Sequence, residues 1–234
     1  MQKQISTFLL PFILLVTANL TIAQSDYKIV SRDSLSKGKF ILIFINKDTA
    51  LNDTVKQRLI NTFYSVYPKE AAMYNKNTAR KVTFVIDPAY DGVAATGNDT
   101  VRFNPQWFHK HPGDIDVVTH EVMHIVQAYP NDAGPGWITE GIADYVRYKT
   151  GIDNVGAGWT LPEYNTKQNY DNSYRITARF FEWIEEHYDH SFVKTLDAAM
   201  RSKTYTDAFC KQHSGKTFSQ LWEEYAKNPV IKVK

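Results

Sequence analysis

The sequence His120-Glu121-Val122-Met123-His124 is the most informative segment of the chain. Two histidines four residues apart lie on the same face of an α-helix, with their Cα atoms about 6 Å apart at the helical rise per residue. From these positions two imidazoles can bind one zinc ion, and Glu121 can activate a water molecule at the metal instead of binding it. The spacing therefore predicts a zinc helix that needs a third protein ligand from another part of the chain.

A second acidic segment, Glu140-Gly141-Ile142-Ala143-Asp144, follows closely, since only 15 residues separate His124 from Glu140. That length is sufficient for two antiparallel helices with Glu140 facing back toward the histidines. Glu140 is therefore the best candidate for the third zinc ligand. Asp144 lies one helical turn further on and could accept the free ring N–H of a ligating histidine, a contact that metal-bound histidines usually make.

The same residue types also occur on ordinary helices, so a histidine pair with a salt-bridged glutamate over a core helix is the alternative without a metal. The composition of the segment argues against this alternative, because buried charged groups need partners or a metal ion. Apolar residues surround the ionisable groups: Ile115, Val117, Val118, Val122, Met123, Ile125 and Val126. We therefore interpret the segment as a metal site.

The local sequence also narrows the class of zinc protein. The extended pattern with a third histidine six residues after the second fails, because Gln127 and Pro130 occupy the positions of its glycine and its histidine. The pair Glu140 and Asp144 on a second helix instead resembles the gluzincins, the thermolysin-like zinc proteases. That resemblance implies Glu140 as the zinc ligand and Asp144 as the carboxylate behind a ligating histidine.

Longer strings resemble the basic secretory protein family of plants and bacteria, which is regarded as a group of metallopeptidases. They are HEVMHIVQ (120–127), GWITEGIADYVR (136–147), DGVAATGNDTVRFN (91–104), SYRITARFFEWI (173–184) and GKTFSQLWEEYAK (215–227). The resemblance covers roughly residues 85–230. It implies an α+β, zincin-like fold, with a small N-terminal mixed sheet and helices, the HExxH helix, and a mainly helical C-terminal half that flanks the cleft.

Apolar periodicity and turn residues predict the order of the elements. Strands are predicted at 40–45, covered on both faces, and at 82–86, and a hairpin at 93–104 around residues 97–99. Helices are predicted from 52 or 53 to Pro68, between 112 and 130, at 137–149 and 173–187, from 191, at 205–211, and from 217 onward with a capping box.

Two segments are candidates for the walls of a substrate cleft. Residues 100–104 could be an edge strand that pairs with an extended peptide, and an ordinary hairpin without a ligand is the alternative. Residues 151–172 form a long segment without a clear period but with several aromatic residues. Since long loops in compact domains are usually functional or disordered, we interpret this one as a packed wall of the cleft.

Residues 1–23 have the charged start, short apolar run and small-residue cleavage site of a secretory signal peptide. The apolar run is too short to span a bilayer comfortably, so we expect a secreted protein, extracellular or periplasmic. A single domain is predicted for residues 24–234. Residues 24–38 are too short for a folded pro-domain, and a disordered leader is one interpretation of them.

Charge and cysteine content exclude several classes of partner and chemistry. The formal net charge is +2, which is too small to indicate nucleic acid or an anionic membrane as a partner. Cys210 is the only cysteine, so it forms no disulfide within the chain, and we interpret it as a buried apolar side chain. We expect a peptide or protein substrate, one catalytic zinc ion, and a monomer.

Together these residues predict a secreted zinc metallopeptidase in which zinc polarises the scissile carbonyl and Glu121 is the general base. Tyr174, Tyr170 and Arg179 are candidate donors to the oxyanion. Tyr174 is the preferred catalytic candidate, and ordinary packing is the alternative for each of the three. Two other functions stay open: a non-catalytic secreted binding or defence protein on a zincin-like fold, and a non-peptidase zinc amidase. The other histidines are interpreted as surface or capping groups, although His109 or His111 could approach the cleft.

Overall fold

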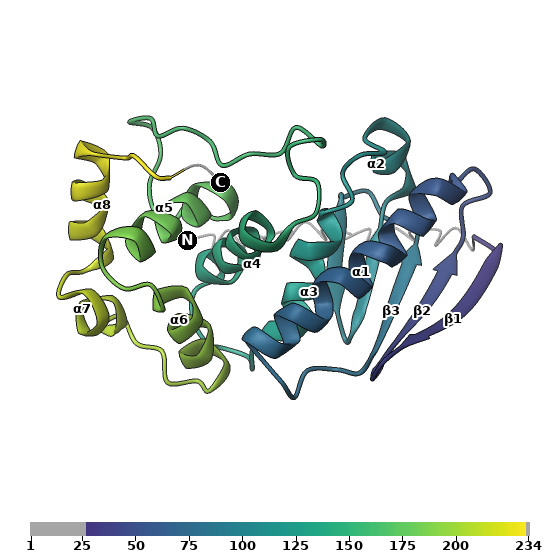
Figure 1. The fold of residues 1–234 in the computed structure, drawn as a ribbon, viewed down its shortest axis with the longest axis horizontal. Helices are drawn as coiled ribbons and strands as arrows, with labels where there is room; N and C mark the ends of the chain where they lie inside the picture. Colours follow the sequence, from purple (N-terminus) through teal and green to yellow (C-terminus); the bar gives the residue numbers. More distant parts are fainter. Residues whose placement is uncertain (1–26, 233–234) are drawn as a thin grey trace, which may run out of the picture.

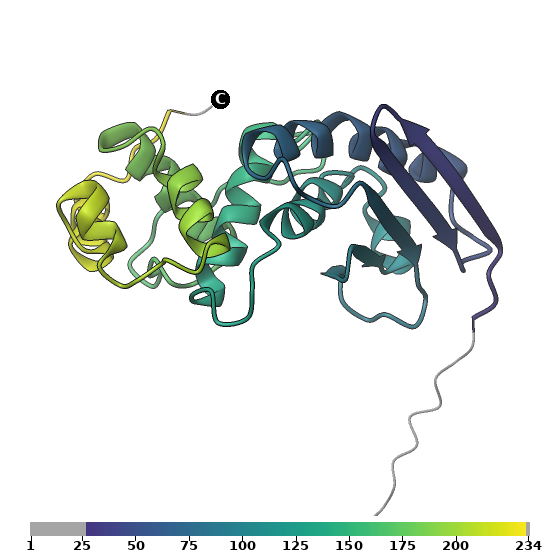
Figure 2. The same ribbon diagram turned by 90° about the horizontal axis from the view of Figure 1, so that it is seen from below.

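A computed structural model describes residues 27–232, and the predicted signal peptide, residues 1–23, lies outside this part of the chain. The strands are β1 (Ser31–Lys37), β2 (Phe40–Asn46), β3 (Lys81–Ile86), β4 (Ala94–Gly97) and β5 (Thr100–Phe103). The helices are α1 (Asp53–Met73), α2 (Pro105–Lys110), α3 (Val117–Gln127), α4 (Gly136–Thr150), α5 (Tyr174–His187), α6 (Phe192–Arg201), α7 (Phe209–Ser214) and α8 (Phe218–Lys227). The sheet and α1 occupy one end of the molecule, α5 to α8 occupy the other, and α3 and α4 lie between them (Figure 1, Figure 2).

The strands form one mixed sheet in the order β1-β2-β3-β5-β4. The central strands β2, β3 and β5 run parallel, while β1 and β4 pair antiparallel at the two edges. Alternate residues of the central strands, such as Phe44 and Phe84, are fully buried. Phe84 packs edge-on against Phe63 of α1, with ring centroids 5.5 Å apart. This arrangement confirms the predicted α+β class with an N-terminal mixed sheet.

Strand β2 is fully buried on one face only, so the prediction that both faces are covered is wrong. Leu42 and Phe44 are inaccessible to solvent, whereas Ile41 is 36% exposed and Ile43 is half-buried. The continuous apolar run is misleading because β-branched residues also stabilise strands in half-buried positions.

Helix α1 begins as predicted but continues beyond Pro68, so the prediction that Pro68 ends it is wrong. The side chain of Asn52 caps the first turn. A proline inside a helix removes one backbone hydrogen bond. Burial of Tyr67 and Ala71 in the last turns, where α1 packs against α3, offsets that loss.

Strand β1 occupies part of the segment for which a disordered leader was one interpretation, and that interpretation is wrong for residues 31–37. Every residue of β1 has a partner in β2, from Ser31 opposite Asn46 to Lys37 opposite Phe40. The strand has few apolar residues, because an edge strand is held mainly by backbone hydrogen bonds to its neighbour. Its polar side chains are typical of an edge that does not aggregate.

The predicted hairpin is confirmed, but the predicted edge strand is not. β4 and β5 are joined by a tight turn in which Asn98 and Asp99 have φ values of 50° and 55°, as a two-residue hairpin turn requires. β5 also pairs with β3, so it lies inside the sheet. The hairpin therefore leaves β4, and not residues 100–104, as the edge strand at this end of the sheet.

The C-terminal helices follow the prediction closely. α8 begins with the predicted capping box of Thr217 and Gln220, while α7 begins at Phe209, four residues later than predicted. Cys210 is buried, as expected. None of the helices within residues 27–232 has the length and apolar character needed to cross a membrane.

Glu70, on the face of α1 that packs against α3, is fully buried, and its two carboxyl oxygens lack a hydrogen-bond partner within the described chain. Burial raises the pKa of Glu70 well above its usual 4.5, against the opposing charge of His120. The folded protein therefore retains a proton that the unfolded chain releases above pH 4.5. The contribution of Glu70 to stability is complete below that pH and declines as the pH rises toward the raised pKa.

Glu70→Met should therefore stabilise the protein at pH 7 by about 1–3 kcal/mol, because it removes two unsatisfied buried oxygens. The gain should be smaller near pH 4, where the unfolded chain also holds the proton. Urea unfolding of the wild type and the variant at both pH values measures this difference in the free energy of unfolding. Glu223→Met, at an exposed position of α8, is the matched control and should change the unfolding free energy by less than about 0.5 kcal/mol. A less stable Glu70→Met variant at pH 7 would contradict this account.

Candidate metal centre

Three acceptor atoms from two helices converge near the middle of the molecule. His120 and His124 of α3 have their Nε2 atoms 3.2 Å apart. Oε2 of Glu140, on α4, lies 3.2 Å from Nε2 of His120 and 3.5 Å from Nε2 of His124. Within residues 27–232, these three side chains form the group whose atoms could hold a metal ion.

Hydrogen bonds on the far side of each ring determine which nitrogen faces the cluster. Nδ1 of His120 lies 2.7 Å from Oδ1 of Asp144, and Nδ1 of His124 lies 2.7 Å from Oε1 of Gln127. Because both oxygens are acceptors, each Nδ1 donates its proton, and Nε2 is the ring nitrogen that is directed at the cluster and could bind a metal ion. The amide nitrogen of Gln127 donates to the carbonyl of Thr139 on α4, 2.9 Å away, and so ties the two helices together.

The electrostatics of the cluster favour a positive charge at its centre. Burial by itself lowers the pKa of His120, but the hydrogen bonds to Asp144 and Glu140 outweigh burial and raise that pKa to about 10. The pKa of Glu140 is lowered despite its burial, because both imidazoles lie beside it. A metal cation bound by all three side chains would supply this positive charge.

The donors and their separations fit a zinc ion. Two imidazoles and one carboxylate are a known ligand set of catalytic zinc sites. Atoms that bind one tetrahedral zinc ion at about 2.0–2.1 Å lie roughly 3.3–3.4 Å from each other. The observed separations are 3.2, 3.2 and 3.5 Å. The structure thus brings together the three predicted ligands in a geometry that zinc can use.

Glu121 lies on α3 next to the first histidine, yet it contacts the edge strand and not the ligand cluster. Its Oε2 accepts a hydrogen bond from the hydroxyl of Thr96 on β4, 2.6 Å away. Glu121 is only 7% exposed, but it lines the cavity that surrounds the three ligand atoms. β4 therefore positions this carboxylate at the cavity wall, beside the metal ligands and not among them.

Tyr174, at the start of α5, lies over the cluster. Its ring is nearly parallel to that of His120, with centroids 6.1 Å apart. Burial and the nearby charge of Glu140 raise the pKa of the phenol. The backbone of Ser173 and Tyr174 has φ values of 66° and 51°, which non-glycine residues rarely adopt. Backbone strain of this kind is concentrated at functional sites.

The other two candidate oxyanion donors lie elsewhere, outside the cavity lining. Tyr170 packs in an aromatic cluster with Trp137 and Phe218. Arg179 is buried and donates to the hydroxyl of Tyr225, 3.1 Å away. Packing, the alternative considered for them, is the better interpretation of Tyr170 and Arg179.

The position of Glu140 depends on a close contact between α4 and α5. A Cβ atom on the next residue, Gly141, would lie 2.3 Å from Cγ2 of Thr177 and 3.1 Å from the ring of Phe181. Thr177 cannot easily move aside, since it is fully buried and its hydroxyl donates to the carbonyl of Tyr170 at 2.6 Å. Glycine at this position lets the two helices approach each other.

A cavity of about 1170 Å³ surrounds the ligand atoms. Residues 93–96 line one side, residues 157–159 of the long loop line another, and α5 contributes Tyr174 and Arg175. The interpretation of the long loop as a wall of the cleft is therefore supported by its residues 157–159. His111 also lines the cavity, whereas His109 lies 3.1 Å from a carboxylate oxygen of Asp48.

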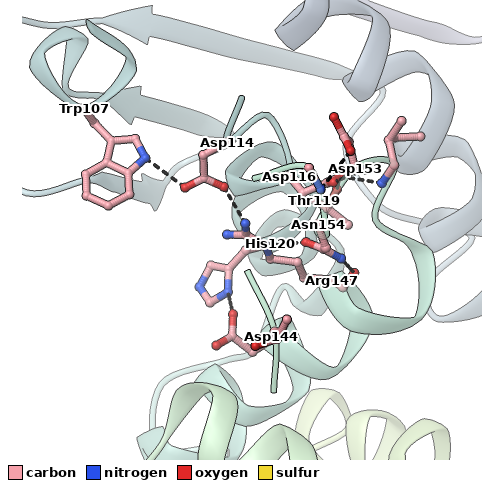
Figure 3. A network of polar contacts seen from close by, with 12 residues as sticks. Trp107, Asp114, Asp116, Thr119, His120, Asp144, Arg147, Asp153 and Asn154 are labelled. Atoms are coloured by element: carbon pink, nitrogen blue, oxygen red, sulfur yellow. Dashed lines mark hydrogen bonds and ion pairs between the residues drawn. The ribbon is translucent and has the colours of Figure 1, made fainter. Parts of the chain in front are cut away.

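A network of polar contacts anchors the long loop to the metal-bearing helices (Figure 3). Asp116, just before α3, accepts hydrogen bonds from two consecutive backbone N–H groups at the start of the loop, at 2.8 and 2.6 Å. Arg147 of α4 pairs with Asp114 and donates to Asn154 at 3.0 Å. The guanidinium of Arg147 also lies 4.5 Å from the ring centre of Trp159, which holds this indole at the cavity.

Sequence reasoning missed two residues of the centre, Gln127 and Thr96. In the sequence, Gln127 marks only a position where the longer histidine pattern fails. Its spacing of three residues after His124 places it on the same helical face and could have identified it as the partner of Nδ1. No spacing could have identified Thr96, because its contact with Glu121 joins a strand to a helix 25 residues later.

The fold and the geometry of the centre define a zincin-like protein. A solved variant of a two-domain M1 zinc metallopeptidase, bound to L-tryptophan, is similar with a TM-score of 0.50 and 11% identity, over 86% of this chain and 52% of that one. An M1 zinc metallopeptidase from Deinococcus radiodurans has a TM-score of 0.45 and 9% identity, over 88% of this chain and 52% of that one. The first likeness shows the fold alone, and this chain spans about half the length of both proteins.

A family model matches residues 23–225, and the chain belongs to that family, BSP, described as a peptidase of plants and bacteria. This match confirms the resemblance to the basic secretory protein family. No curated protein matches the sequence.

Gly141→Ala should move α4 away from α5 and displace Glu140 from the ligand cluster. We expect zinc affinity to fall at least about tenfold, measured by competition with a chromogenic chelator, and the unfolding free energy to fall by roughly 1–3 kcal/mol. Adding Thr177→Ser removes the nearest methyl group and should restore part of both losses. Gly136→Ala is the control, since a Cβ atom there meets nothing within 4 Å. Equal losses with and without Thr177→Ser would show that this contact does not set the position of Glu140.

Proposed function

We propose that the chain is a secreted zinc-dependent metallopeptidase with His120, His124 and Glu140 as the zinc ligands. The observation that carries this proposal is the convergence of three acceptor atoms within 3.2–3.5 Å of one another, with the carboxylate of Glu121 beside them at the cavity wall. Membership of a family described as a peptidase supports it further. Secretion rests on the signal-like composition of residues 1–23.

Each residue of the centre has a distinct role in this proposal. When bound, zinc supplies Lewis acidity, which makes water more acidic and a carbonyl more electrophilic. Glu121 accepts a proton from the attacking water and passes it to the leaving amine. Asp144 and Gln127 keep both imidazoles in the tautomer that leaves Nε2 free. Thr96 holds Glu121 in place through a hydrogen bond of 2.6 Å.

Tyr174 is the proposed donor to the oxyanion that develops on the scissile carbonyl. Its phenol projects over the ring of His120, and its raised pKa keeps the proton on the oxygen. A donor that is aimed at the developing charge lowers the barrier of acyl transfer.

The substrate proposed for this cleft is an extended peptide. β4 is one of the two edge strands of the sheet, and it lines the cavity together with the residue before it. An extended peptide can add to such an edge through backbone hydrogen bonds. This addition would carry the scissile bond past Glu121, which β4 contacts through Thr96.

Zinc-loaded protein should cleave casein, and a chelator should abolish the cleavage. Glu121→Gln should lower kcat by about 10²–10⁴, the usual contribution of a general base, while zinc stays bound. Glu223→Gln, on the exposed face of α8, is the matched control and should retain full activity.

The outcomes separate the three candidate functions. Unchanged cleavage by Glu121→Gln would remove this residue from the mechanism. Zinc binding by the wild type without cleavage of any peptide would favour the non-catalytic binding protein. Cleavage of cell-wall peptide amides without cleavage of casein would favour the zinc amidase.

Glu140→Ala should abolish stoichiometric zinc binding, because a ligand is lost and two imidazoles remain. We expect the affinity to fall by more than about 100-fold, beyond what the loss of an outer contact costs. Zinc content after dialysis, measured by atomic absorption, tests this, with Glu223→Ala as the control. Unchanged stoichiometry in Glu140→Ala would reassign the third ligand, and Asp144 would be the next candidate.

A further inference from the structure

Arg175 projects into the same cavity as the metal centre, one residue after Tyr174. It is exposed and lines the cavity. Nη1 of its guanidinium donates to the carbonyl of Thr160, 3.3 Å away, which follows the cavity-lining residues 157–159 of the long loop. This bond restrains the guanidinium at the cavity without neutralising its charge.

The other ionised groups at the cavity already have partners. Arg147 pairs with Asp114, His120 with Asp144, Glu140 with both imidazoles, and Glu121 with Thr96. Among residues 27–232, Arg175 has no carboxylate within ion-pair distance, and Thr160 is the partner of its guanidinium. Arg175 is therefore a cation at the cavity that lacks a carboxylate partner within the described chain.

Helix stability does not explain this placement. Arg175 lies in the first turn of α5, where a cation opposes the helix dipole. The preceding residues, Ser173 and Tyr174, hold positive φ values, which add strain. Both features are unfavourable for the folded state, yet Tyr174 and Arg175 both line the cavity.

A guanidinium carries five N–H donors in a rigid planar arrangement that matches a carboxylate. One Nη1 hydrogen of Arg175 is used by Thr160, so the remaining donors can bind both oxygens of a carboxylate. We propose that Arg175 selects peptides with a carboxylate at this point of the cleft, either an acidic side chain or the C-terminal carboxylate; this inference rests on the proposed peptidase function.

The test uses zinc-loaded wild type, Arg175→Gln and Arg175→Glu with a peptide library whose members have either free or amidated C-termini. Cleaved peptides are identified by mass spectrometry. We expect the wild type to favour peptides with Asp or Glu at one fixed position, or peptides with a free C-terminus, and these two results distinguish the two sources of the carboxylate. Arg175→Gln should reduce the preference about tenfold, the effect of a charge-assisted bidentate contact.

Two further readouts separate selection from a structural role. Arg175→Gln should raise KM for the preferred peptides and leave kcat nearly unchanged, because a contact with a carboxylate that does not react is equally strong in the bound substrate and in the transition state. Its melting temperature should not fall, since the replaced cation opposed the helix dipole. Arg175→Glu should reverse the preference toward Lys and Arg. Arg80→Gln, at an exposed position outside the cavity lining, is the matched control and should leave the preference unchanged.

Cleavage without a carboxylate preference, or a preference that persists in Arg175→Gln, would overturn the proposal for Arg175 while leaving the peptidase function intact. An absence of all cleavage by the wild type would instead contradict the peptidase function. In that case fluorescence anisotropy decides the question, with labelled peptide pairs that differ only in Glu or Gln, or only in a free or amidated C-terminus. Equal affinity of the wild type for both members of each pair would then overturn the selection of a carboxylate.

Discussion

Glu140 reaches the two histidines because α4 packs closely against α5 at Gly141 and is tied to α3 through Gln127. The first contact sets the distance of α4 from its neighbour, and the second sets its position along α3. Both depend on atoms that do not bind the metal. The ligand separations of 3.2–3.5 Å are therefore a result of helix packing, and a small shift of either helix would disperse the three acceptors.

The cleft combines contributions from the two ends of the molecule. The sheet end supplies β4 and, through Thr96, the orientation of Glu121. The helical end supplies Tyr174 and Arg175 at the start of α5, where two residues hold unfavourable backbone conformations. The strain at this helix start and the unsatisfied carboxyl of Glu70 behind the metal-bearing helix both reduce stability. The well-packed apolar core around α3 compensates for them.

Predictions from sequence were accurate where a local signal decides the structure and failed where a distant contact decides it. The hairpin turn, the capping box of α8 and the two helices of the centre were predictable, since turn residues, capping side chains and apolar periodicity act within a few residues. The end of α1 was not predictable from local sequence. The helix continues past Pro68 because its last turns are held by packing against α3. β1 was not predicted either, because its stability comes from a partner strand and not from its own polar sequence.

The amino-acid sequence by itself determined the family, the zincin-like class, and which side chains are candidates for the metal, because helical spacing places His120 and His124 on one face whatever surrounds them. Only the tertiary structure decided that β4 is the edge strand at the cleft, that Thr96 holds Glu121, and that Arg175 lines the cleft without a carboxylate partner. These features depend on contacts between residues of separate elements. Their distances depend on how a sheet and two helices pack in three dimensions, which no repeat along the chain encodes.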